Sequence, residues 1–247
     1  MRKRELVGAL GLTLFILGVL AGVFFIGLTV WADLEATLFN LQPRQYAFFR
    51  ELHCPPVLIS GETGTIRARF KNPLDQTINL FIRAHVSHGY VTLRREIITE
   101  LTLAPGEVKQ LQWTISEDDA AFNRIILFRI MVRGGHPLPN RQATCGVMLL
   151  HMPYLTGWQM TTILLGGSIL AILAGDVLWF VSRRPYRRFS RVMILLTLSV
   201  FGGLLAGARR WWVVGAMFLV IILLTVGAVM GHFLNNPGSG KKGISIG

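Results

Sequence analysis

The chain has 247 residues, of which 52% are hydrophobic and only 15% are charged. Ordinary soluble domains are about 25% charged, so the low charge and the long apolar runs exclude a purely soluble protein and a disordered chain. The formal net charge is +12. Its distribution argues against nucleic-acid binding, because a nucleic-acid-binding protein concentrates basic residues on its folded domain.

The basic residues that give the chain its positive net charge lie mainly at the ends of apolar runs. Between positions 32 and 157 there are 13 Lys or Arg and 11 Asp or Glu residues, so this stretch is nearly neutral. Such placement follows the positive-inside rule of membrane proteins and favours contact with anionic lipid headgroups. The basic groups next to apolar runs are Arg2, Lys3 and Arg4; Arg183, Arg184, Arg187, Arg188 and Arg191; and Lys241 and Lys242.

The first apolar run extends from Leu6 to Trp31 without a charged residue. The apolar region of a cleaved signal peptide is only about 7–15 residues long, and this run is longer. A membrane span needs about 20 apolar residues, and this run is long enough. We therefore expect residues 1–31 to form an uncleaved signal-anchor helix. Residues 32–157 are then expected to be an extracytoplasmic domain.

Residues 50–152 have the pattern of short β-strands. Apolar and other residues alternate in 65–70, 80–86 and 111–115, and further candidate strands are 57–60, 96–103, 125–132 and 144–150. Turn residues such as Ser60-Gly61 and Gly134-Gly135 separate these segments. Several short strands with regularly spaced turns are typical of an antiparallel, immunoglobulin-like β-sandwich.

Three turns of this region have a recognisable pattern. They are Asn72-Pro73-Leu74-Asp75, Ser87-His88-Gly89 and Leu103-Ala104-Pro105-Gly106-Glu107. This pattern resembles prokaryotic immunoglobulin-like modules of the CARDB and NEW3-like class, in which an N-x-x-D turn precedes one strand and an L-x-P-G-E turn precedes a later one. The resemblance is limited to the β-region and implies a fold, not an activity, and it identifies no family for the whole chain.

The two cysteines, Cys54 and Cys145, both lie in the expected external domain. An oxidising exterior favours a disulfide between them. In the chain-entropy model, closing such a long loop stabilises the domain by about 4–5 kcal/mol. The alternatives are two free thiols, or a metal pair with His53, although a structural metal site uses three or four ligands.

Three further apolar runs follow, at 158–181, 192–208 and 211–230. Only Arg209 and Arg210 separate the last two, so we expect a tight helical hairpin within a three-helix membrane region, 158–231. The basic loop after residue 181 is expected on the cytoplasmic side, together with the N-terminus and a flexible tail, 232–247. The tryptophans expected at the outer interface, where amphipathic rings prefer to lie, are Trp31, Trp158, Trp211 and Trp212.

Small residues recur at four-residue spacing in the expected helices. Such pairs let helix backbones approach closely in a membrane, which predicts a packed four-helix bundle or a docking face for another subunit. The alternative is that glycine is simply common in membrane helices. The pairs are Gly18 and Gly22, Ala171 and Gly175, Gly203 and Gly207, and Gly227 and Gly231.

Asp176 is the one acidic residue inside an expected span. Carboxylates within a membrane are costly and often functional. We expect a structural ion pair between Asp176 and Arg183 near the inner boundary. A contact with another subunit and a proton or ion path are the alternatives.

The sequence contains no familiar catalytic motif such as G-x-S-x-G, H-E-x-x-H or a phosphate-binding loop. The acidic run Glu117–Asp119 indicates a solvated loop, or a helix start capped by Ser116, rather than a calcium site. His85 and His88 are three residues apart on an expected strand, so they point to opposite faces and cannot chelate together. We therefore expect no enzyme activity, no cofactor and no metal site.

The expected function is that of a non-catalytic integral-membrane accessory or structural subunit. It would dock through its helices with other subunits of a larger hetero-complex and contact external partners through its sandwich. The absence of an Asn-x-Ser/Thr acceptor in the external domain favours a prokaryotic plasma membrane. The alternatives are an independent surface receptor or adhesion module, and a small transporter centred on Asp176.

Overall fold

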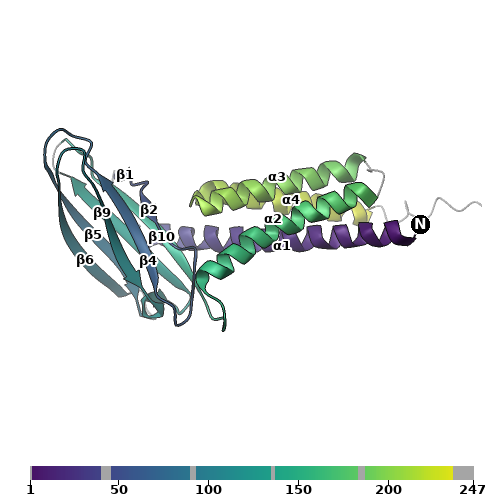
Figure 1. Ribbon diagram of the computed structural model, residues 1–247, viewed down its shortest axis with the longest axis horizontal. Helices are drawn as coiled ribbons and strands as arrows, with labels where there is room; N and C mark the ends of the chain where they lie inside the picture. The colour runs from purple at the N-terminus through teal and green to yellow at the C-terminus, as the bar shows by residue number, and fades with distance from the viewer. Residues whose placement is uncertain (1, 40–45, 90–92, 135–136, 183–186, 236–247) are drawn as a thin grey trace, which may run out of the picture. The chain divides into compact units, whose positions relative to one another are not determined.

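The structure is a computed structural model that describes residues 2–39, 46–89, 93–134, 137–182 and 187–235 (Figure 1). The chain divides into two compact units. One unit is Leu28–Leu164, and it contains the β-strands and the adjoining helix ends. The other consists of Met1–Gly27 and Leu165–Gly247 and is helical in its described part.

Four helices in the described residues are long and apolar enough to span a membrane. They are α1 (Arg2–Leu38), α2 (Gly157–Ser182), α3 (Arg187–Ala208) and α4 (Trp212–Asn235). Every expected apolar run is helical except at Trp211, which precedes α4, and α4 continues past residue 231 to Asn235. Helix α1, however, continues past Trp31, the end of the expected span, to Leu38.

A short turn joins α3 to α4, as the two adjacent arginines predicted. Arg210 has a φ of 60°, in the left-handed region. The N–H of Trp211 donates to the carbonyl of Ala206 at 2.9 Å, and the N–H of Arg210 donates to that of Gly207 at 3.2 Å. This pair of bonds with a left-handed residue is a Schellman motif, which satisfies the last carbonyls of α3.

The strands form two sheets. The larger sheet has the order β1-β10-β9-β5-β6, with β3 also paired to β10 and β8 to β9. The smaller sheet has the order β2-β4-β7. The strands are β1 (Ala47–Phe48), β2 (Leu52–His53), β3 (Val57–Ile59), β4 (Gly64–Lys71), β5 (Ile78–His88), β6 (Leu93–Leu103), β7 (Val108–Ile115), β8 (Ala120–Ala121), β9 (Ile125–Gly134) and β10 (Arg141–Leu150).

The expectation of a wholly antiparallel arrangement is wrong at one edge of the larger sheet. Strands β1 and β3 run parallel to β10, whereas β5, β6, β8 and β9 pair antiparallel to their neighbours. Both parallel strands belong to one segment, 47–59, which runs in the same direction as β10. Between them β2 pairs with β4 of the smaller sheet, so this segment passes from one sheet to the other and back.

Apolar side chains of both sheets meet in one core. In β4 the core-facing residues Ile66, Ala68 and Phe70 are buried while the residues between them are exposed, which is the alternation of a half-buried strand. The rings of Trp113 from β7 and Phe128 from β9 lie 5.3 Å apart between centroids. Contacts of this kind join the two sheets. All seven segments that were expected to be strands contain strand residues of these sheets.

Candidate functional site

The predicted disulfide between Cys54 and Cys145 is confirmed. Cys54 directly follows β2, and the buried Cys145 lies on β10. The disulfide therefore links segment 47–59, which passes between the two sheets, to β10, the strand with which β1 and β3 pair.

The acidic run Glu117–Asp119 forms a short 3₁₀ helix, and the carboxylates of Glu117 and Asp119 accept hydrogen bonds from other residues of the domain. The Glu117 carboxylate accepts bonds from the Ser60 hydroxyl and, at 2.8 Å, from the Gly61 N–H. These donors hold the pKa of Glu117 below its ordinary value. Asp119 Oδ2 accepts from the Ser116 N–H and from Arg95, each at 3.1 Å. Among the described residues no cluster of three or more His, Cys, Asp or Glu side chains is arranged to hold a metal ion.

The end of α1 packs on the larger sheet, and we call this contact the junction. Asp33 is only 4% exposed, and its Oδ1 accepts the N–H of Gly146 on β10 at 3.1 Å. A Cβ atom at Gly146 would lie 1.9 Å from the carbonyl oxygen of Ala32, so only glycine fits. The apolar members of the junction are Ala32, Ala36, Ala121, Ile125 and Leu127.

A second contact fixes the start of α2 to the β-strands. Glu62 Oε2 accepts the N–H of Gly157, the first residue of α2, at 2.8 Å and that of Ile59 at 3.3 Å. A carboxylate at a helix N-terminus satisfies an unpaired N–H and favours the helix dipole. Thr156 and Gln159 add a reciprocal capping box, with bonds of 3.2 and 3.0 Å.

In the helical unit, several glycines lie at close contacts between helices. A Cβ at Gly18 would lie 2.8 Å from Cγ1 of Ile172, and one at Gly175 would lie 2.6 Å from the backbone nitrogen of Phe15. The hydroxyl of Ser168 donates to the carbonyl of Gly18 at 2.8 Å. Helices α1 and α2 are therefore in backbone contact along this line.

The other predicted small-residue positions differ in their surroundings. A Cβ at Gly22 would lie 2.6 Å from Cγ1 of Val200, and one at Gly203 would lie 2.5 Å from Cδ1 of Ile26. Ala171 lines the contact at Gly18, and Gly207 is buried. Gly227 and Gly231 on α4 have nothing within 4 Å of an added Cβ among the described residues.

Asp176 of α2 contacts α3. Thr197 Oγ1 donates to Asp176 Oδ2 at 2.9 Å, while the buried Asp176 Oδ1 has no hydrogen-bond partner in the described part of the chain. Arg183 lies outside the described residues, so the expected ion pair between them stays a prediction. Of the tryptophans expected at the interface, Trp31, Trp158 and Trp211 are exposed, and Trp212 is half-buried.

A cavity of about 420 Å³ opens between the sheets at the ends of β9 and β10 opposite to the junction. Its volume lies in the range of small-molecule sites, about 300–1,000 Å³. The rings of Phe49 and Phe70 form a stacked pair within it, 5.2 Å apart between centroids. The other apolar residues that line it include Ile78, Leu80, Val132 and Leu138.

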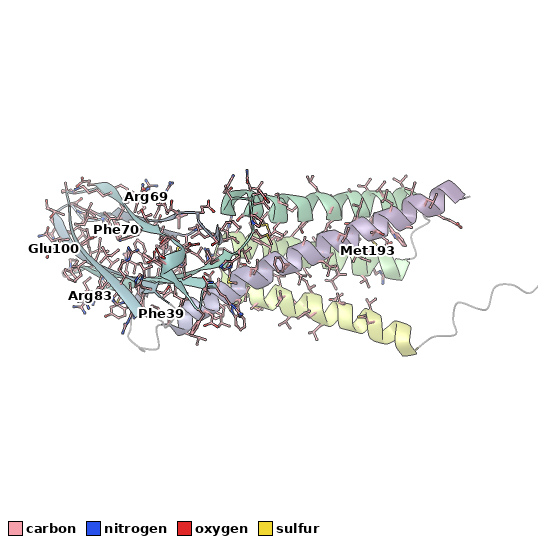
Figure 2. The ribbon with its side chains drawn as sticks, turned by 90° about the horizontal axis from the view of Figure 1, so that it is seen from below. Phe39, Arg69, Phe70, Arg83, Glu100 and Met193 are labelled. Carbon is pink, nitrogen blue, oxygen red and sulfur yellow. A yellow bond between two sulfur atoms is a disulfide. The ribbon has the colours of Figure 1, made fainter. Side chains whose placement is uncertain are left out.

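Charged residues also line this end cavity. Arg69 and Lys71 come from β4 and Arg141 begins β10, and all three are exposed (Arg69 and Phe70 are labelled in Figure 2). Glu51 is the one acidic residue in the lining. No ion pair within 4 Å joins these four side chains to any residue that the structure describes.

Reasoning from the sequence did not find the junction or the end cavity. Gly146 carried a usable signal, because an isolated glycine in a strand often marks a close backbone approach. Thr156 and Gln159 have the spacing of a capping box. Glu62 and the cavity residues had no such signal, since tertiary structure alone brings them to their partners.

No protein-family model and no curated protein matches the chain. Among solved structures, it is similar to the CARDB domain of the PF1109 protein from Pyrococcus furiosus, in complex with di-metal ions. The two are 14% identical with a TM-score of 0.32, over 41% of this chain and 90% of that one. A CARDB domain, the class of module that the β-region was expected to resemble, is thus among the solved structures that the chain matches.

Two enzymes are further matches, each over a small part of its length. Bacteroides uniformis β-glucuronidase 2 is 17% identical with a TM-score of 0.29, over 39% of this chain and 12% of that one. A Paenibacillus cycloisomaltooligosaccharide glucanotransferase is 11% identical with a TM-score of 0.31, over 42% of this chain and 14% of that one. No activity is transferred from these matches.

Proposed function

We propose that this chain is a four-span membrane protein that holds an immunoglobulin-like β-sandwich outside a prokaryotic plasma membrane and serves as a non-catalytic accessory subunit. The N-terminus, the loop between α2 and α3 and the tail are cytoplasmic in this proposal. The positions of the basic groups support this orientation, because cytoplasmic loops carry the excess of Lys and Arg.

The junction is the observation that carries the proposal. A domain joined only by flexible linkers would not need a buried Asp33 on Gly146 or a Glu62 carboxylate on the first N–H of α2. These bonds fix the ends of α1 and α2 that belong to the β-unit to its sheets. Helix ends anchored in this way suit a brace or adaptor within an assembly.

The helices support docking with other membrane proteins. Exposed apolar side chains cover much of α4, and Gly227 and Gly231 leave its backbone accessible on one face within the described residues. Small residues of this kind let a neighbouring helix approach closely. We assign the partner role to other membrane-protein subunits, with lipid covering the remaining apolar surface.

The native size of the protein tests this proposal. Extraction of the natural membrane in a mild detergent, followed by size-exclusion chromatography with light scattering, should give a protein mass well above the 27.5 kDa of one chain. Replacing Gly227 and Gly231 by Leu should reduce this mass, whereas the matched replacement of Gly166 and Gly167 on α2 serves as a control. A monodisperse species of one chain would contradict the subunit role.

An independent surface receptor is the second candidate, and the end cavity favours it. A receptor needs a site that opens to the exterior, and this one lies at the end of the strands opposite to the junction. Under this alternative the purified chain alone would be the functional unit.

A further inference from the structure

We propose that the end cavity binds a small organic anion that has an apolar or ring-shaped body and one carboxylate or phosphate group. This inference goes beyond the subunit role and does not depend on it, because the cavity is lined by other residues than those of the junction and the helices that the subunit role uses.

The floor of the cavity is apolar. Phe49 and Phe70 are packed into the domain core, 5% and 2% exposed, and their rings stack with an interplanar angle of 26°. The apolar surface that a ligand can contact comes mainly from the exposed Pro73 and Pro139 and the half-buried Leu138, which also line the cavity. Ligand sites are commonly lined in this way, with few polar groups to fix the orientation of the ligand.

The charged residues of the lining determine which sign of ligand charge the cavity favours. Arg69, Lys71 and Arg141 stand against Glu51 alone, and none of the four is in an ion pair with a residue that the structure describes. Elsewhere in the same domain, Arg83, Arg95 and Lys109 do have carboxylate partners at 2.7, 3.1 and 3.2 Å. A cationic rim around an apolar interior is complementary to an anionic headgroup on an apolar body.

Arginine supports the choice of a carboxylate or phosphate group. Its planar guanidinium matches both groups with two parallel hydrogen bonds, and such charge-assisted bonds are stronger than neutral ones. Two arginines and a lysine at one rim therefore favour an oxyanion over a neutral or cationic group. Glu51 limits the excess positive charge and disfavours a ligand with several anionic groups.

The test uses the full chain in phosphatidylcholine nanodiscs and a fluorinated probe, 4-(trifluoromethyl)benzoate, observed by fluorine NMR. The wild type should bind the probe saturably. The neutral analogue 4-(trifluoromethyl)benzyl alcohol should bind about tenfold more weakly, since a hydrogen bond to a charged group is worth more than a neutral one. A phosphate probe, 4-(trifluoromethyl)phenyl phosphate, shows which oxyanion the rim prefers.

Variants localise the binding. Arg69→Gln and Arg141→Gln should each weaken benzoate binding by about tenfold, whereas Arg67→Gln, an exposed position of the same strand outside the lining, should leave it unchanged. Melting curves show that each variant folds. Absence of saturable binding of either anionic probe to the wild type would overturn the proposal, as would equal binding by the wild type and the two cavity variants. The subunit role would survive either result, because it is tested by native mass.

Discussion

His85 shows how burial sets the charge of a single residue in this domain. Its side chain is buried on β5, and Nε2 lies 3.6 Å from Oε1 of Glu96 on β6. Burial lowers the pKa of His85 from its ordinary 6.5, and Arg94 and Arg129 also lower it, while Glu96 acts in the opposite direction. The folded domain therefore favours neutral His85, and the unfolded chain takes up a proton more readily.

This difference predicts a loss of stability in mild acid. The contribution of His85 is complete above pH 6.5 and is lost as the pH falls from there toward the lower pKa of the folded state, because the unfolded chain then binds more protons. His85→Gln should flatten the pH dependence of the melting temperature in this window. The control is His88→Gln on the same strand, where half of the side chain is exposed. An unchanged slope in His85→Gln would contradict this explanation.

The junction between α1 and β10 is the contact that matters most at the scale of elements. Replacing Asp33 by Leu removes the carboxylate that accepts the buried N–H of Gly146. This loss should lower the free energy of unfolding by about 1–3 kcal/mol. Asp33→Asn keeps an oxygen at the same position and should lose less. Hydrogen exchange at the Gly146 amide, measured beside thermal melting, checks both variants. A Leu variant with wild-type stability and amide protection would show that the junction does not fix the helix end.

The elements themselves could largely be predicted, because their patterns are local. Alternation in β4 comes from Ile66, Ala68 and Phe70, and the charge-free run from Leu6 identifies α1. The end of α1 could not be predicted from the apolar run. The run ends at Trp31, where the first charged residues follow, whereas the helix continues through Asp33 to Leu38. Strands β1 and β3 have only two and three residues, and the alternation of side chains in a strand does not tell whether it pairs parallel or antiparallel. The junction and the cavity depend on contacts between distant segments, which no local pattern records.

At the scale of the whole molecule, the account depends on which side of the membrane each segment occupies. The disulfide between Cys54 and Cys145 favours an external β-domain, because disulfides form and persist in oxidising environments. The basic groups at the helix ends support that orientation, and the exposed tryptophans Trp31 and Trp158 lie near the ends of the helices that enter the domain.

Cysteine labelling of intact cells tests this orientation most directly. Cys54 and Cys145 stay bonded, and one new cysteine is introduced either at the exposed Thr77 of the β-domain or at Ser239 of the tail. A maleimide that cannot cross membranes should label Thr77→Cys in intact cells, and Ser239→Cys only after the cells are opened. Labelling of Ser239→Cys in intact cells, with Thr77→Cys protected until lysis, would contradict the account.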